Sequence, residues 1–203
     1  MIKKIQSKDF KIKLEVFDSQ HRGAFFQIID AIKSTDAEIL FFLNSDDSYH
    51  EKRLEYFVHS LSEYTHAWGF SDVHVLNSAT NKSEYENYLN NILDFQKEKK
   101  TSNEFFKYNY MISTGNLVLK NPRYYANMFS LFKLDNVHDW YMVRNLAMIE
   151  EPVYIPLKLY NYRLHDSNTI SNNIAENEIE AKIVQFIEQQ VIALGFFGLD
   201  NKD

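Results

Sequence analysis

Two adjacent carboxylates follow an apolar run, and this is the pattern in the sequence that most plainly suggests chemistry. The apolar run spans residues 39–43, and the acidic loop, residues 44–48, comes directly after it with the sequence Asn44-Ser45-Asp46-Asp47-Ser48. A buried strand that ends in acidic residues holds oxygen ligands rigidly at a sheet edge. Such ligands suit a divalent cation that also binds phosphate. The pattern therefore indicates a site for the metal ion of a nucleotide.

Three more groups of reactive side chains stand at the ends of apolar elements. They are Ser113–Asn116, His138–Trp140 and Tyr162–His165. In open α/β sheets, ligands bind beyond the carboxyl ends of the strands, so loops that are distant in sequence can converge there. We expect these three groups and the acidic loop to meet at one site.

Each group also has a purely structural interpretation. Ser45, Asp46 or Ser48 could cap a helix that begins near residue 51, because helix N-termini favour oxygen acceptors and negative charge. Asp139 could likewise be an N-cap, and His165 a hydrogen-bonded histidine at or near the surface. Residues 113–116 could be the turn that leads into a strand.

Hydrophobic periodicity predicts the elements that position these groups. Residues 12–16 and 38–43 have the character of strands, and the apolar residues between them fall at helical spacing over 25–32. A second helix is expected over 54–61 and a further strand over 67–76. An order of strand, helix and strand is typical of a parallel sheet.

The second half of the chain begins with a polar insertion. The polar and charged sequence of residues 78–109 predicts a mobile segment with one helix around 85–95. This segment is a candidate for a loop that covers the substrate. The later predictions are a short helix after Pro122, a helix that opens at Asp139, strands over 153–155 and 159–162, and a C-terminal amphipathic helix over 179–194. We expect two units, a domain over 1–173 and the helical segment 174–203 packed on it.

Composition limits the class of protein. With 203 residues, 45% of them hydrophobic, the chain can bury a real core. A net charge of −6 argues against nucleic acid as a partner, since such binders carry a concentrated basic face. The absence of cysteine excludes disulfides, thiolate zinc sites and cysteine nucleophiles. No apolar run reaches the roughly 18 residues that span a bilayer, so we expect a cytoplasmic protein, with association at the inner membrane face left open.

The order and flanks of these motifs resemble the inverting glycosyltransferases of family 2, over about residues 11–171. Arg22-Gly23, the helix over 24–33 and the stretch 37–47 are similar to the family's glycine-led helix and metal motif. Residues 138–144 resemble its later acidic motif, and residues 154–156 and 160–165 its closing strands and Tyr-Arg-x-His segment. The resemblance implies the GT-A fold, an α/β domain with a mixed, mainly parallel sheet and helices on both faces.

The resemblance also implies a role for each matching residue. Asn44-Ser45-Asp46 would be the DxD-type motif, with Asp46 on the Mg²⁺ or Mn²⁺ that neutralises the diphosphate of a UDP- or GDP-sugar. Asn44 replaces the first aspartate and would hydrogen-bond hydroxyls of the donor, and Asp47 would be a further donor contact. Arg163 and His165 would close on the diphosphate and the metal.

Asp139 would be the general base that takes a proton from the acceptor hydroxyl of a glycan or a lipid-linked glycan. The family often has glutamate before this aspartate, and this chain has His138 there. The family's opening nucleotide-binding strand and its acidic turn are absent before Gly23. The chain would therefore be a fragment of a longer protein or a shortened relative.

Two other functions remain open at this level. A catalytically silent module of the same fold would bind a sugar or a protein partner through the same residues. A metal-dependent phosphohydrolase using Asp46 and Asp47 would need further carboxylates or histidines nearby. The sequence leaves open the sugar, the nucleotide, the acceptor and the oligomeric state.

Overall fold

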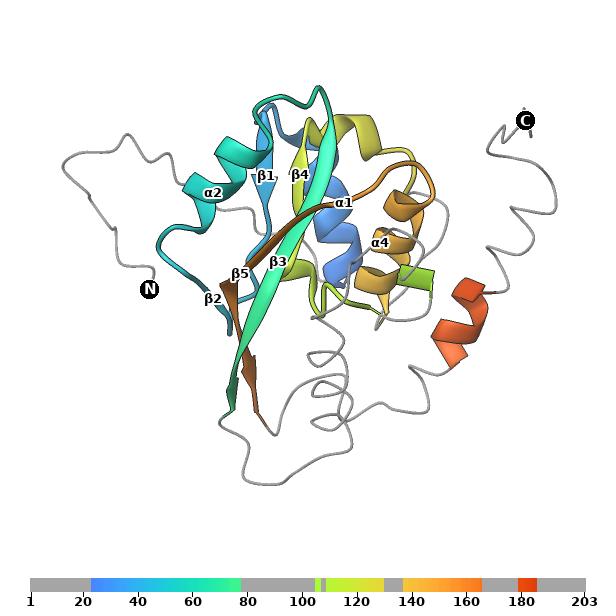
Figure 1. Cartoon of the computed structure of the whole chain (residues 1–203). Helices are drawn as coiled ribbons and strands as arrows, with labels where there is room; N and C mark the ends of the chain where they lie inside the picture. Colours follow the sequence, from blue (N-terminus) through green and yellow to red (C-terminus); the bar gives the residue numbers. More distant parts are fainter. Residues whose placement is uncertain (1–22, 78–104, 107–108, 130–136, 166–178, 186–203) are drawn as a thin grey trace, which may run out of the picture.

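The computed structural model describes residues 23–77, 105–106, 109–129, 137–165 and 179–185 (Figure 1). The predicted strand over 12–16, most of the predicted insertion over 78–109 and the last part of the predicted C-terminal helix lie outside these residues. The described elements, in chain order, are α1 (Ala24–Ser34), β1 (Ile39–Phe41), β2 (Ser48–Tyr49), α2 (Arg53–Ser60), β3 (Ala67–Asn77), the 3-10 helix η2 (Thr114–Asn116), β4 (Val118–Lys120), the 3-10 helix η3 (Pro122–Tyr125), α4 (His138–Ala147) and β5 (Val153–Leu164).

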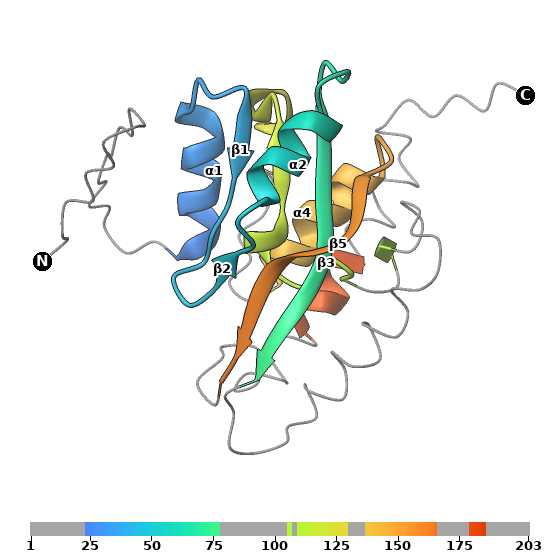
Figure 2. The same cartoon turned by 60° about the vertical axis from the view of Figure 1, so that its left-hand side comes forward.

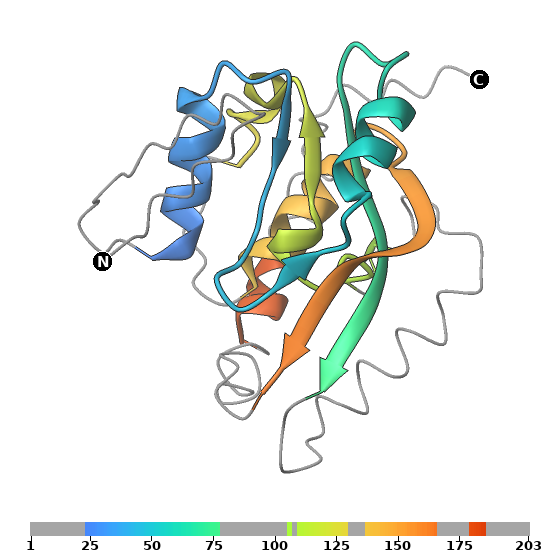
Figure 3. The same cartoon turned by 90° about the vertical axis from the view of Figure 1, so that its left-hand side faces the viewer.

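The strands form one curled sheet of five in the order β1-β4-β3-β5-β2. β4 runs antiparallel to both of its neighbours, β1 and β3, and β2 runs antiparallel to β5. In the described residues, β3 and β5 make the parallel pair. Figure 3 shows how the sheet curves, with β2 leading from the turn after β1 to the edge of β5. The sheet is therefore a mostly antiparallel half-barrel.

The predicted GT-A-like, mainly parallel sheet is wrong. The prediction assumed that strands separated by one helix lie side by side and parallel, as in a β-α-β unit. Here β1 pairs with β4, about 80 residues further along the chain, in the pairing Leu40 to Leu119. Alternation of apolar residues indicates that a segment is a strand, but it does not indicate which strand lies beside it or in which direction.

Most of the predicted element types agree with the structure. Helices stand at 24–34, 53–60 and 138–147, and a short helical segment follows residue 121. The two short strands predicted over 153–155 and 159–162 are one strand, β5, whose register with β3 shifts between Ile155 and Tyr160. Pro156 lies in this interval, and because proline has no N–H to donate, it suits an irregular position in a ladder.

Two cores cover the opposite faces of the sheet. The larger core holds Trp68 and Phe70 of β3 with buried residues of α1 and α4, and the smaller core packs Ala67 of β3 against Phe57 of α2. This division follows the two-residue period of a strand, in which neighbouring side chains point to opposite faces. Figure 2 shows α2 in front of the sheet and α4 behind it.

The described part of the C-terminal segment, residues 179–185, is helical. Val184 is buried in the larger core, and the Glu180 carboxylate accepts a hydrogen bond from the Val137 backbone N–H at 3.0 Å. This short helix therefore contacts the start of α4. Among the helices of the described ranges, none is long and apolar enough to cross a bilayer.

Candidate functional site

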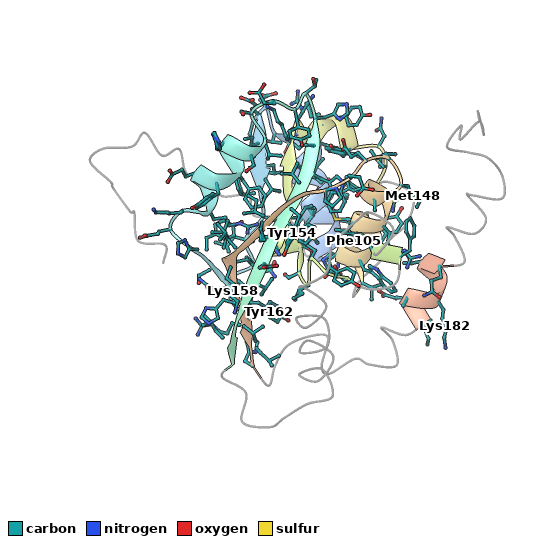
Figure 4. All side chains as sticks on the ribbon, viewed as in Figure 1. Phe105, Met148, Tyr154, Lys158, Tyr162 and Lys182 are labelled. Carbon is teal, nitrogen blue, oxygen red and sulfur yellow. The ribbon has the colours of Figure 1, made fainter. Side chains whose placement is uncertain are left out.

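The acidic loop lies against the end of β5, so two of the predicted motifs meet. The Asp46 carboxylate oxygen Oδ2 is 3.0 Å from His165 Nε2, and the Arg163 guanidinium donates from Nε to the Asp46 backbone oxygen at 3.0 Å. The backbone N–H of Arg163 donates to Asp47 Oδ1 at 2.8 Å. Tyr162, labelled in Figure 4, marks this end of β5. These contacts join residues that are more than 115 positions apart in the chain.

The two carboxylates of the acidic loop have different surroundings. Asp47 is half-buried and accepts hydrogen bonds from the Asn44 amide at 3.1 Å, the Tyr160 hydroxyl and the Arg163 backbone. Burial raises the pKa of Asp47, and the hydrogen bonds from Tyr160 and Arg163 oppose that rise. The Asp46 side chain is 40% exposed and has His165 beside it. Asp47 therefore anchors the loop, and Asp46 is presented to solvent.

The helix-cap interpretation of the acidic loop is wrong. The helix α2 begins at Arg53, its N-cap residue is Lys52, and no side chain caps it by a hydrogen bond. The strand β2 separates the loop from the helix. The polar side chains of the loop are therefore held by tertiary contacts.

The turn over Ser113–Asn116 is also next to the acidic loop. The Asn44 amide donates to Ser113 Oγ at 2.7 Å, and Ser113 Oγ lies 3.3 Å from the Tyr160 hydroxyl. Gly115 leaves the space that Tyr160 occupies, since a Cβ atom at Gly115 would lie 2.1 Å from the Tyr160 hydroxyl oxygen. The turn, the loop and β5 are thus held together around one tyrosine hydroxyl.

Arg53 lies behind this site and was not foreseen from the sequence. Its side chain is fully buried, and its guanidinium donates to Ser71 Oγ at 2.8 Å and to the side chain and backbone oxygens of Asn116 at 3.0 and 2.8 Å. The guanidinium carbon also lies 4.8 Å from the ring centre of Tyr49 and 5.6 Å from that of Tyr160. Burial lowers the pKa of Arg53 to about 10. The sequence does not indicate that an arginine at the start of a helix will be buried and hydrogen-bonded to residues of distant segments.

Asp139 occupies a different environment, in the first turn of α4. Its side chain is nearly buried, with 7% of its surface exposed. Asn109 donates from its amide to Asp139 Oδ2 at 3.0 Å, and the Trp140 backbone N–H donates to Oδ1 at 2.8 Å. Burial raises the pKa of Asp139, and the charge of His138 and these hydrogen bonds oppose the rise. The N-cap interpretation is wrong here too, because Val137 is the N-cap of α4.

One short segment connects the two carboxylate environments. Asn109 contacts Asp139, and Ser113, four residues later, contacts Asn44 of the acidic loop. Between them, Ile112 is buried and has a φ of 72°, a conformation that is unusual for a β-branched residue. Strained backbone of this kind persists where the surrounding structure fixes it. The segment over residues 109–113 therefore contacts both carboxylate environments, and its buried residue Ile112 has an unusual backbone conformation.

A metal ion at this site would have few ligands from the protein. The described ranges contain no cluster of three or more histidine, cysteine, aspartate or glutamate side chains suited to a metal. Asp46 and His165 offer one oxygen and one nitrogen, 3.0 Å apart. Mg²⁺ commonly takes one or two protein ligands and completes its coordination with water and substrate phosphates. The donor set fits a cation that binds together with a phosphate ligand.

No protein family, curated protein or solved structure matches this chain.

Proposed function

We propose that this chain is a metal-dependent glycosyltransferase that transfers a sugar from a nucleoside diphosphate donor to a hydroxyl of a glycan acceptor, with inversion. One observation carries the proposal. The acidic loop and the Arg163–His165 segment, singled out separately in the sequence, meet within hydrogen-bonding distance at Asp46 and Asp47. The proposal depends on these side chains and on the resemblance of their motifs to family 2, and takes no support from the sheet topology.

The donor side of the reaction belongs to the acidic loop. Asp46 and His165 would hold Mg²⁺ or Mn²⁺, and the positive charge of that ion would stabilise the diphosphate leaving group. The guanidinium of Arg163 lies against the same loop and adds a second positive charge for the phosphates. The amide nitrogen of Asn44 donates to Asp47 and Ser113, and its amide oxygen accepts a hydrogen bond from a hydroxyl of the sugar donor.

The acceptor side belongs to Asp139. As the acceptor oxygen attacks the anomeric carbon, the bond from that carbon to the diphosphate oxygen breaks and its electron pair leaves with the diphosphate. Asp139 takes the proton of the acceptor hydroxyl. A carboxylate is a better base when its pKa is raised, which burial achieves for Asp139.

The metal-dependent step is tested by calorimetry of UDP and GDP binding with and without Mn²⁺. We expect Mn²⁺ to strengthen binding in the wild type and to have no effect in Asp46→Ala, because the oxygen ligand is lost. Asp36→Ala is the matched control: Asp36 is also an aspartate with an exposed side chain, but it pairs with Arg123 away from the acidic loop. Failure of the wild type to bind either nucleotide at any Mn²⁺ concentration would contradict the proposal.

A specific observation favours a second candidate function, a silent module that binds a sugar or a partner without transfer. Both oxygens of Asp139 already accept hydrogen bonds within the protein, and the side chain is nearly buried. Sugar binding without any transfer product would support this candidate. The phosphohydrolase alternative loses support, since the described ranges hold no cluster of three metal-binding side chains.

A further inference from the structure

Asn109 approaches Asp139 from outside α4. Its amide nitrogen donates to Asp139 Oδ2 at 3.0 Å across a sequence separation of 30 residues. An amide N–H can only donate, so this contact stabilises the carboxylate form of Asp139 over the carboxylic acid. A protonated Asp139 would itself donate a hydrogen bond and would favour the amide oxygen of Asn109 over the amide nitrogen.

The other end of the Asn109 amide has an unusual environment. Its oxygen, Oδ1, is buried and has no hydrogen-bond partner within the part of the chain that the structure describes. A buried acceptor without a partner is costly, and native proteins keep few of them without a functional reason. The side chain thus keeps its nitrogen toward Asp139 although its oxygen is unsatisfied.

Two side chains of α4 donate to backbone oxygens of residues 105 and 106, shortly before Asn109 in the chain. The Trp140 indole donates to the Phe105 backbone oxygen at 2.8 Å, and the Arg144 guanidinium donates to the Phe106 backbone oxygen at 3.0 Å. Figure 4 labels Phe105 at this position beside α4. On the other side, the Ile112 backbone N–H donates to the Asn109 backbone oxygen at 3.1 Å. Residues 105 and 106 are therefore tied to the helix that carries Asp139, and Asn109 begins a hydrogen-bonded turn that ends at Ile112.

We propose that Asn109 is the positioning residue of Asp139: its amide holds the carboxylate ionised and in one orientation, ready to accept the proton of the acceptor hydroxyl. This role rests on the proposed function, because it is useful only if Asp139 is a base. The same segment carries Ser113, which accepts a hydrogen bond from Asn44, so Asn109 lies on the stretch of chain that links the surroundings of Asp139 to the acidic loop.

Within the described ranges, two other charged side chains lie at the start of α4, near Asp139. His138 precedes it in α4 and its charge lowers the pKa of Asp139, whereas burial raises it. Glu180, on the helix over 179–185, accepts from the Val137 backbone at the start of α4. A titration of Asp139 therefore needs to follow His138 and Glu180 as well.

The test is a carbon-13 NMR titration of the ligand-free protein labelled at aspartate, with the Asp139 signal identified through Asp139→Asn. In Asn109→Ala we expect the titration midpoint of the Asp139 carboxyl to move to higher pH, because a hydrogen-bond donor to the carboxylate is removed. In Asn109→Asp, which keeps the side-chain shape, the midpoint should move further, because a second carboxylate faces it. The acidic limb of kcat/KM should move in the same direction, with kcat near neutral pH reduced about tenfold, which corresponds to one hydrogen bond to a charged group.

Asn145→Ala is the matched control. Asn145 is a buried asparagine on α4 whose amide donates to the Tyr141 backbone oxygen at 2.7 Å and not to Asp139. It should lose stability without moving the Asp139 midpoint. An identical Asp139 midpoint in the wild type, Asn109→Ala and Asn109→Asp would overturn the inference. If no variant and no wild-type protein transfers sugar, the proposed function fails, but the titration still decides whether Asn109 controls Asp139.

Discussion

The exposed carboxylate of Asp46 and the buried carboxylate of Asp139 show how one side-chain type acquires two kinds of chemistry. Asp46 is 40% exposed, next to His165 and the guanidinium of Arg163. Asp139 is nearly buried, and two N–H groups bind its oxygens. An exposed carboxylate beside an imidazole suits a cation that arrives with its own ligands, whereas a buried carboxylate of raised pKa suits proton transfer. The difference comes from the surroundings alone.

Among the variants considered, Asp139→Asn should have the largest effect on sugar transfer. We expect the rate of sugar transfer to fall by about 10²–10⁴, the usual contribution of a general base. The affinity for the nucleotide with Mn²⁺ should stay within about twofold, because the acidic loop is unchanged. Steady-state kinetics with calorimetry on the same preparation makes the measurement. Loss of nucleotide binding in this variant would show that the two carboxylates do not have separate roles.

Arg53→Met tests whether the acidic loop depends on the buried polar network behind it. The substitution removes the three hydrogen bonds that a charged donor makes to Ser71 and Asn116, so we expect a loss of about 3 kcal/mol in unfolding free energy. Urea unfolding measures this loss. The Asp139 side should be affected only through overall stability, and a change in the Asp139 titration midpoint of the folded protein would count against the separation of the two regions.

Gly115→Ala tests the contact between the Ser113–Asn116 turn and β5. The new Cβ atom would lie 2.1 Å from the Tyr160 hydroxyl oxygen, which must then move away from Asp47 and Ser113. We expect a destabilisation of about 2 kcal/mol, typical of overpacking, together with weaker Mn²⁺-dependent nucleotide binding.

Gly69→Ala is the control for Gly115→Ala. There a Cβ atom would lie 2.5 Å from the Val153 backbone oxygen, at the other end of the β3–β5 pair. It should destabilise the fold without a specific effect on nucleotide binding by the folded fraction. Equal weakening by both variants would mean that the turn has no particular link to the acidic loop.

The smallest expected effect is a pH dependence of stability. The folded-state pKa of Asp139 is raised above its value in the unfolded chain, so its contribution is fully present below the unfolded pKa and is lost as pH rises through the folded pKa. Urea unfolding of the wild type should therefore show a fall in stability over that interval. In Asp139→Asn the fall should be smaller, with the contribution of Asp47, whose pKa is also raised, remaining. An unchanged slope would contradict the burial of a titrating Asp139.

Sequence reasoning located the candidate carboxylates better than the groups that support them. Asp46, Asp47, Arg163 and His165 were expected to lie together, and the structure brings them together. Tyr160, which holds Asp47, was noted only as part of a motif. A tyrosine hydroxyl in a strand has no local sequence signature for the partner that it will meet.

The fold shows the same limit. The helix α2 and the strand β3 could be predicted because hydrophobic residues repeat at the period of each element. The relative direction of the strands could not be predicted, because β1 pairs with β4 and β2 with β5, and these partners are distant in the sequence. A β-α-β order favoured parallel strands, and the pairings that formed are mostly antiparallel.

Local periodicity and residue chemistry are enough to predict the types of the elements, the position of the acidic loop after a strand and the supply of carboxylates. The tertiary structure alone decided which carboxylate is buried, that Arg53 lies behind the loop and that Asn109 binds Asp139. These features depend on partners that are distant in the chain, such as Asn109 for Asp139, 30 positions away, and His165 for Asp46, 119 positions away. Local pattern carries no information about which of those residues will meet.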